Sequence, residues 1–219
     1  MRELLPGAPV RTVHLGALPL PPAAGPAPLP DLSDRPYIVA IGTLERRKNL
    51  PRLVAAFGAM AANEPDLLLV LAGSAGDDSA AISDAIDLLG PQLAPRVLRT
   101  GRISDDVRAW LLRNAALIAY PSLDEGFGFP LLDAMQAGVP LVASTAGSIP
   151  EVAGEAALLC PAHDVDALAA ALTTALTDDA LRARLVAAGA DRLPHFTWDR
   201  CADGMVDLYR DVVHGTISR

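Results

Sequence analysis

The chain has 219 residues and a formal net charge of −8 at pH 7, which argues against broad nucleic-acid binding because that function needs a basic face. Its longest strongly apolar run, residues 67–72, is far too short to span a bilayer. The two cysteines lack metal-ligand spacing and the first residues lack a signal-peptide pattern, so we expect a soluble, cytoplasmic protein with reduced thiols.

The first 35 residues differ from the rest of the chain. Residues 10–14 could form a short strand, and the Pro- and Ala-rich stretch 19–30 predicts an extended connector. From residue 36 onward apolar strand patterns alternate with helical spacing. We therefore expect a connector and first strand in 1–35, and one Rossmann-like domain over 36–219 that includes the C-terminal helix.

Short apolar runs predict strands at residues 37–41, 67–71, 97–100, 117–120, 140–143 and 156–160. Helical spacing predicts helices after Asn49 and Ser104, the expected N-caps, and from Pro130, and also at 79–89, 165–176, 179–189 and 198–213. Strands alternating with helices, without hairpin turns, predict an α/β fold: a Rossmann-like parallel sheet of about six strands with helices on both faces.

In such a sheet, ligands bind beyond the carboxyl ends of the strands. Gly42, Gly73, Gly101 and the loop around Glu125 each follow a predicted strand. We therefore expect these four positions to lie along one rim of the sheet.

The segment 124–135 carries the most specific chemistry on that rim. Gly126 and Gly128 allow close backbone approach, and a helix that starts at a proline offers free amides to a phosphate. Glu125 could accept hydrogen bonds from sugar hydroxyls, and Asp133, about two turns into the helix, could face the same ligand. These residues predict a nucleotide-sugar site. Alternatively, the glycines only shape a turn, Glu125 pairs with an arginine, and Asp133 lies on an exposed helix face.

A second segment, Gly42-Thr43-Leu44-Glu45-Arg46-Arg47-Lys48-Asn49, follows the first strand of the domain. Lys48 is the only lysine among 18 Lys and Arg residues. A compact ammonium binds phosphate as a point charge, and beside the Glu125 helix it could neutralise a diphosphate leaving group. The alternative is a solvated basic turn.

The loop Gly101-Arg102-Ile103-Ser104 closes the third strand of the domain. A nucleobase could lie against Ile103, or the loop could be an ordinary turn with a serine cap. The four histidines form no metal pattern, so no metal site is expected. His14 could reach the rim, although packing is the preferred interpretation.

Four segments, 41–50, 125–142, 148–152 and 161–164, resemble in sequence and in order the retaining glycosyltransferases of family four, which have the two-domain GT-B fold. The resemblance covers nearly the whole chain but only the C-terminal, donor-binding half of that fold. It implies a glycosyltransferase that moves a sugar from a nucleotide-diphosphate sugar to a glycan or glycoconjugate, with retention and without a metal or other cofactor.

The resemblance also implies residue roles. Arg47 and Lys48 would hold the donor diphosphate, Glu125 the donor sugar hydroxyls, and the backbone from Phe127 to Phe129 the distal phosphate. Asp133 stands where the family usually has a ribose-binding glutamate, which is one methylene longer. The expected catalytic residues are Arg47, Lys48 and Glu125; the expected donor-binding residues are Gly42, Thr43, Ile103, Gly126, Phe127, Gly128, Phe129 and Asp133.

The basic turn resembles that of mannosyltransferases, so GDP-mannose is the first donor candidate and a UDP-sugar the next. The acceptor-binding N-terminal domain, or a partner subunit in its place, is expected as a partner, and a membrane contact is expected only through that partner. Alone, the chain should bind a nucleotide sugar but transfer little. The alternative is a non-catalytic nucleotide-sugar-binding or partner-docking module.

Overall fold

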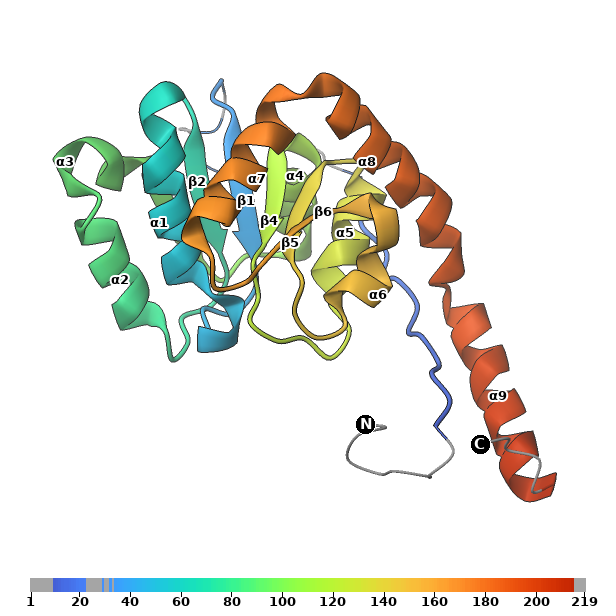
Figure 1. The fold of residues 1–219 in the computed structure, drawn as a ribbon. Coiled ribbons are helices and arrows are strands. Elements are labelled where there is room, and N and C mark those ends of the chain that lie inside the picture. The colour runs from blue at the N-terminus through green and yellow to red at the C-terminus, as the bar shows by residue number, and fades with distance from the viewer. Residues whose placement is uncertain (1–9, 23–28, 30–31, 33, 215–219) are drawn as a thin grey trace.

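The computed structural model describes residues 10–22, 29, 32 and 34–214. Within these residues, six strands form one parallel sheet in the order β3-β2-β1-β4-β5-β6 (Figure 1). The order reverses between β1 and β4, which makes that position the topological switch point of the sheet. The strands are β1 Tyr37–Ile41, β2 Leu68–Ala72, β3 Val97–Gly101, β4 Leu117–Tyr120, β5 Leu141–Ser144 and β6 Leu158–Cys160. The predicted parallel sheet is confirmed.

Helices cover both faces of the sheet and create two apolar cores. Ile38 and Leu69 point into the core beneath α1 (Leu50–Met60), α2 (Ser79–Asp87) and α7 (Val165–Thr177). Their neighbours Tyr37 and Val70 point into the opposite core, beneath α4 (Asp105–Asn114), α5 (Phe129–Ala137) and α6 (Ile149–Ala153). Successive side chains of β1 and β2 enter the two cores in turn, so both faces of each strand are buried. This explains why the sequences of these strands are continuously apolar.

The chain ends in two long helices, α8 (Asp179–Arg192) and α9 (Trp198–His214). Figure 1 shows α9 extending away from the sheet, and none of its residues is buried. The remaining short elements are α3 Gly90–Leu93 and the 3₁₀ turns η2 Arg46–Lys48, η3 Ala61–Asn63, η4 Ala94–Arg96, η5 Gly154–Ala156 and η6 Leu193–His195. All the predicted helices are present, with ends that shift by a few residues.

The expected strand at residues 10–14 is wrong, because this segment has no strand structure. It lies beside α9 instead: Arg11 forms an ion pair with Asp211 at 2.8 Å, and Val13 packs against Gly204. A strand needs a neighbouring strand to satisfy its backbone groups, whereas this part of the chain is held by side-chain contacts. The division of the chain at residue 35 stays a prediction, since part of 1–35 lies outside the described residues.

Asn49 precedes α1 as expected, but its side chain does not cap the helix. Its backbone is left-handed, with φ of 60°. Its side-chain amide donates instead to the carbonyl oxygens of Pro121, at 2.9 Å, and Ala162, at 2.7 Å. Asn49 therefore connects the loops that follow β1, β4 and β6, because a buried amide finds backbone carbonyls within reach on both sides.

A buried ion pair joins α4 to α5. Arg108 Nη1 lies 2.5 Å from Asp133 Oδ2, and their side chains are 18% and 10% exposed. Burial raises the pKa of Asp133 above its ordinary value, and the Arg108 guanidinium only partly opposes that shift. Ionisation of the buried Asp133 carboxyl therefore costs free energy, and the nearby Arg108 guanidinium reduces that cost.

We predict that Arg108→Ala lowers the free energy of unfolding by about 2–4 kcal/mol at neutral pH, because it leaves Asp133 buried without a counter-charge. The pKa of Asp133 should rise further in this variant. Its protonation then relieves the penalty, so the difference from wild type should narrow as the pH falls through that raised pKa. Urea unfolding at pH 7.5 and pH 5 measures both values. Arg184→Ala, which removes an exposed arginine of α8, is the matched control, and a pH-independent difference would contradict the prediction.

Candidate functional site

The basic loop after β1 lies directly on the loop after β2. A side chain at Gly73 would place its Cβ 2.0 Å from the carbonyl oxygen of Gly42, and one at Gly76 would come 2.5 Å from that of Leu44. The Leu44 amide donates to Ser74 at 3.0 Å. Glycines in the second loop thus allow the first to pack backbone to backbone, which fixes the position from which Arg47 and Lys48 project.

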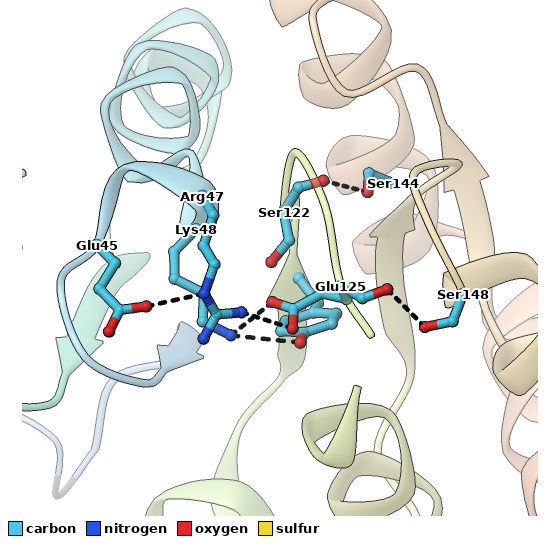
Figure 2. A network of polar contacts seen from close by, with 8 residues as sticks. Glu45, Arg47, Lys48, Ser122, Glu125, Ser144 and Ser148 are labelled. Carbon is cyan, nitrogen blue, oxygen red and sulfur yellow. Dashed lines mark hydrogen bonds and ion pairs between the residues drawn. The ribbon is translucent and has the colours of Figure 1, made fainter. Parts of the chain in front are cut away.

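The carboxylate of Glu125 is shared between two cations from that basic loop (Figure 2). Lys48 Nζ lies 2.6 Å from Glu125 Oε1, and Arg47 Nη1 lies 2.6 Å from Oε2. The Lys48 and Glu125 side chains are only 10% and 8% exposed, whereas Arg47 is 47% exposed and also pairs with Glu45. The three expected catalytic residues therefore lie together at the switch point.

Glu125 is held in its ionised form. Burial opposes ionisation, but hydrogen bonds from Lys48 and Tyr120 outweigh it and hold the pKa of Glu125 below its ordinary value. Lys48 also donates to Tyr120 Oη at 3.3 Å and lies 4.9 Å from the centre of that ring. Burial, the largest cause, and then Glu125 raise the pKa of Tyr120, so its hydroxyl stays protonated at neutral pH.

The backbone of Glu125 is fixed from the other side, by the loop after β5. Its carbonyl oxygen accepts hydrogen bonds from Ser148 Oγ at 2.9 Å and from the Ser148 amide at 3.1 Å (Figure 2). Gly147 has φ of 55°, and a Cβ there would come 2.6 Å from the same carbonyl oxygen. The Leu123 amide in turn donates to the carbonyl of Arg47 at 2.7 Å. Three loops therefore determine where the Glu125 carboxylate lies.

The start of α5 has the features expected of an anion site. Gly128 occupies the N-cap position with φ of 96°, Phe129 and Pro130 begin the helix, and no side chain caps it. Pro130 has no N–H, and the Leu131 amide donates to the carbonyl oxygen of Gly128 at 2.9 Å. No side chain accepts from the remaining amides at this end, and the helix dipole adds partial positive charge. By contrast, Gly126 is exposed, has no positive φ, and a Cβ there would meet nothing within 4 Å.

Of the other predicted site residues, Gly42 and Thr43 lie beside the basic loop, whereas Asp133 and Ile103 lie in separate surroundings. Asp133 is paired with Arg108, so its carboxylate faces α4 rather than standing free. Thr43 lines an open hollow of about 480 Å³ with Arg46, Arg47 and Asp77. Ile103 lines another, of about 580 Å³, with Arg102, Ser104 and Asp105. Gly42 lies against Lys48, since a Cβ there would come 3.3 Å from Lys48 Cε.

Two further residues lie near the site. His14 Nε2 lies 2.8 Å from Glu151 Oε1, and its ring centroid is 6.3 Å from that of Phe127 and 5.4 Å from that of Phe196. His14 therefore packs, as preferred from the sequence, and it does so against the loop that carries Glu125. Ser122 at the end of β4 is fully buried, and its Oγ has no hydrogen-bond partner among the described residues. Neither residue stands in a recognisable sequence motif.

The described residues offer neither a metal site nor a helix that could span a membrane. No group of three or more His, Cys, Asp or Glu side chains there could hold a metal ion. In the same part of the chain, no helix is both long enough and apolar enough to cross a membrane.

Comparison with known proteins places the chain in a family. The family described as Glycosyl transferases group 1 matches residues 27–192. The O-antigen chain mannosyltransferase B of Escherichia coli is 33% identical over 175 residues, covering 80% of this chain and 45% of that protein. The phosphatidyl-myo-inositol mannosyltransferase of Mycolicibacterium smegmatis is 33% identical over 171 residues, covering 77% and 43%. The chain thus spans somewhat less than half the length of these relatives.

Solved structures agree on the fold. The C-terminal domain of a group 1 glycosyl transferase from Francisella tularensis matches with a TM-score of 0.67 and 22% identity, covering 80% of this chain and 94% of that one. HepE of Anabaena in complex with UDP matches with a TM-score of 0.72 and 22% identity, covering 82% and 50%. The chain belongs to the group 1 glycosyl transferases and has the Rossmann-like fold of the C-terminal domain of a GT-B enzyme.

Proposed function

We propose that the chain binds a nucleotide-diphosphate sugar and forms the donor-binding half of a retaining glycosyltransferase that acts on a glycan or glycoconjugate. The observation that carries this proposal is the meeting of Arg47, Lys48 and Glu125 beside the uncapped start of α5. Cations and free amides suit a diphosphate, and a carboxylate at the same place suits sugar hydroxyls.

The charge balance of the unliganded site suggests how the donor binds. Arg47 and Lys48 are both compensated by Glu125, and Arg47 also by Glu45. An arriving diphosphate would replace the carboxylate as the partner of the two cations. Glu125 would then be free to accept hydrogen bonds from the sugar, so the donor supplies both halves of the exchange.

The same cations would act in the transfer step. As the bond to the sugar breaks, negative charge grows on the departing diphosphate, and pre-positioned positive groups stabilise it. Arg47, Lys48 and the α5 amides would do this without a metal ion. Retention at the anomeric carbon follows the family resemblance.

The relatives guide the choice of donor. Two of them are named mannosyltransferases, which makes GDP-mannose our first candidate. HepE, which shares the fold, was solved with UDP, so UDP-sugars come next. The hollow at Ile103, also lined by Arg102, is where we propose that the base lies.

The acceptor half is proposed to dock along α9. Within the described residues, this helix leaves five large apolar side chains at least 44% exposed: Trp198, Val206, Tyr209, Val212 and Val213. A continuous apolar stripe on a surface helix favours a protein partner. The relatives are about twice as long as this chain, which leaves room for such a half. A membrane contact, if the enzyme makes one, is proposed for that half, and a cytoplasmic location stays a prediction.

A non-catalytic nucleotide-sugar-binding or docking module is the second candidate. One observation favours it: Asp133, at the expected ribose-binding position, is already committed to Arg108. Such a module would keep donor affinity and show no transfer even with an acceptor half present.

We predict that Lys48→Ala lowers affinity for a nucleoside diphosphate about 10- to 100-fold, because it removes a charge-assisted contact to phosphate. Glu125→Gln should behave differently: it releases both cations, so the bare nucleotide should bind at least as well as to wild type, while the preference for the nucleotide sugar should disappear. Calorimetry with GDP, UDP and their sugars measures both effects. Arg184→Ala is the control, and unchanged affinities in both site variants would exclude this site.

We predict that Gly147→Ala costs about 2 kcal/mol or more of unfolding free energy and weakens donor binding, because a Cβ would displace Glu125 and strain a left-handed backbone. Gly126→Ala should leave stability unchanged, since its Cβ meets nothing. Thermal unfolding compares the two variants. A loss of donor affinity in Gly126→Ala would indicate that the bound donor lies against Gly126. Equal stability of the two variants would contradict our conclusion that Gly147 fixes the position of Glu125.

We predict that the purified chain binds the donor but transfers little sugar, because catalysis requires both reactants to be held in one cleft. The measurement is product formation with and without the N-terminal half of a relative supplied in trans. Robust transfer by the chain alone would contradict this prediction.

A further inference from the structure

A second group of cationic side chains lies outside the Glu125 site. It lines a hollow of about 390 Å³ between the N-terminal segment, η6 and the start of α9. This volume is at the lower end of the roughly 300–1,000 Å³ usual for small-molecule sites. The ionisable residues that line it are Arg11, His14, Arg192, His195 and Arg200, and no carboxylate of the described chain lines it.

Two of these guanidiniums form no ion pair with any carboxylate in the part of the chain that the structure describes. Arg11 is paired with Asp211. Arg192, however, bonds only to backbone carbonyl oxygens, those of Glu151 and Val152. Arg200 has no side-chain hydrogen bond or ion pair within the described residues. The hollow therefore has an excess of positive charge in a protein whose net charge is −8.

Arg192 is held in place before any ligand arrives. Its guanidinium lies 5.5 Å from the centre of the Phe196 ring and packs over Gly154, where a Cβ would come within 3.0 Å of it. The two carbonyl bonds use two of the five N–H groups of a guanidinium, so donors remain for a ligand. A fixed planar fork loses little entropy when it binds a phosphate.

Arg200 adds an exposed cation near the amino end of α9. Its amide is capped by Thr197 Oγ1 at 3.2 Å, which fixes the first turn of this 17-residue helix. The helix dipole contributes positive character at that end, and Asp199 in the same turn is the carboxylate that opposes it. A phosphate monoester carries about 1.5 to 2 negative charges at neutral pH, which matches the two guanidiniums of Arg192 and Arg200.

The hollow is separate from the proposed donor site but close to it. Apart from Arg192, its lining lies outside residues 27–192, the region that matches the family. His14 belongs to the lining and also contacts Phe127 of the glycine loop. A ligand in the hollow would thus lie behind the loop that carries Glu125 rather than on Lys48.

We propose that this hollow is a second anion site that binds a phosphate monoester. The phosphate would contact Arg192, which is already held in place, and Arg200, which is exposed at its edge. The phosphate belongs either to a small soluble molecule or to a lipid headgroup, and both present the same group to the two arginines. The site does not depend on nucleotide-sugar binding at Lys48.

Calorimetry with glycerol 3-phosphate tests the soluble ligand. Sedimentation with phosphatidylcholine vesicles, with and without phosphatidic acid, tests the lipid. We compare the wild-type chain with Arg200→Ala and Arg200→Ala/His195→Ala, with Arg184→Ala as an exposed-arginine control and Lys48→Ala as a donor-site control. Circular dichroism checks that each variant is folded.

Arg200→Ala should weaken binding of one of the two ligands roughly three- to tenfold, and the double variant further, because a charge-assisted contact is lost. Arg184→Ala and Lys48→Ala should bind as wild type does. Binding as tight in the double variant as in wild type, or binding that is lost only in Lys48→Ala, would overturn the proposal, as would the absence of binding to either ligand. Loss of donor binding in Lys48→Ala would bear on the proposed donor site alone and would not change the outcome of the test of the second anion site.

Discussion

The bridge from Glu125 to Arg47 and Lys48 is the interaction on which the rest of the site depends. It joins the loops after β1 and β4, the two neighbouring strands between which the order of the sheet reverses. In an open α/β sheet, the connections that follow the two strands at the switch point run in opposite directions, which leaves a crevice beyond the carboxyl ends of these strands. Hydrogen bonds from the Asn49 side chain to Pro121 and from the Leu123 amide to the carbonyl of Arg47 also join these two loops, and the ion pairs add to them. Losing either partner of the buried Lys48–Glu125 pair would leave a buried charge without its counter-charge.

Backbone packing sets the precision of this bridge. Gly73 lets the basic loop approach within contact distance, and Gly147 does the same for the loop that holds the carbonyl of Glu125. Ser148 then hydrogen-bonds that carbonyl. Each glycine removes one Cβ from a place where two backbones meet, so each fixes a distance that a side chain would enlarge. The charged groups are therefore positioned by contacts that carry no charge.

Much of this fold could be predicted from the sequence, because its strands and helices are encoded by local apolar periodicity. The convergence of Lys48 and Glu125 followed from the rule that strand ends share one rim. The pairing of Asp133 with Arg108 did not, since its partner is 25 residues away on another helix. The role of Asn49 and the reach of His14 rest on partners still more distant in sequence, up to 137 residues away. The mistaken strand at residues 10–14 has the same origin, because this segment is held by α9, where Arg11 pairs with Asp211, 200 residues away.

The unliganded bridge also bears on selectivity. Both cations already have a carboxylate partner. The net binding free energy of a simple phosphate is therefore only the difference between pairing the cations with phosphate and pairing them with Glu125, which is small. A nucleotide sugar would offer more: its diphosphate would replace Glu125 on the cations, and its hydroxyls would occupy the carboxylate thus released. With a nucleotide sugar bound, the cations and Glu125 would all have partners. A phosphate alone would pair with the cations but leave the buried Glu125 carboxylate without a partner. Under the proposed function, Glu125 therefore discriminates against partial ligands as much as it binds the complete one.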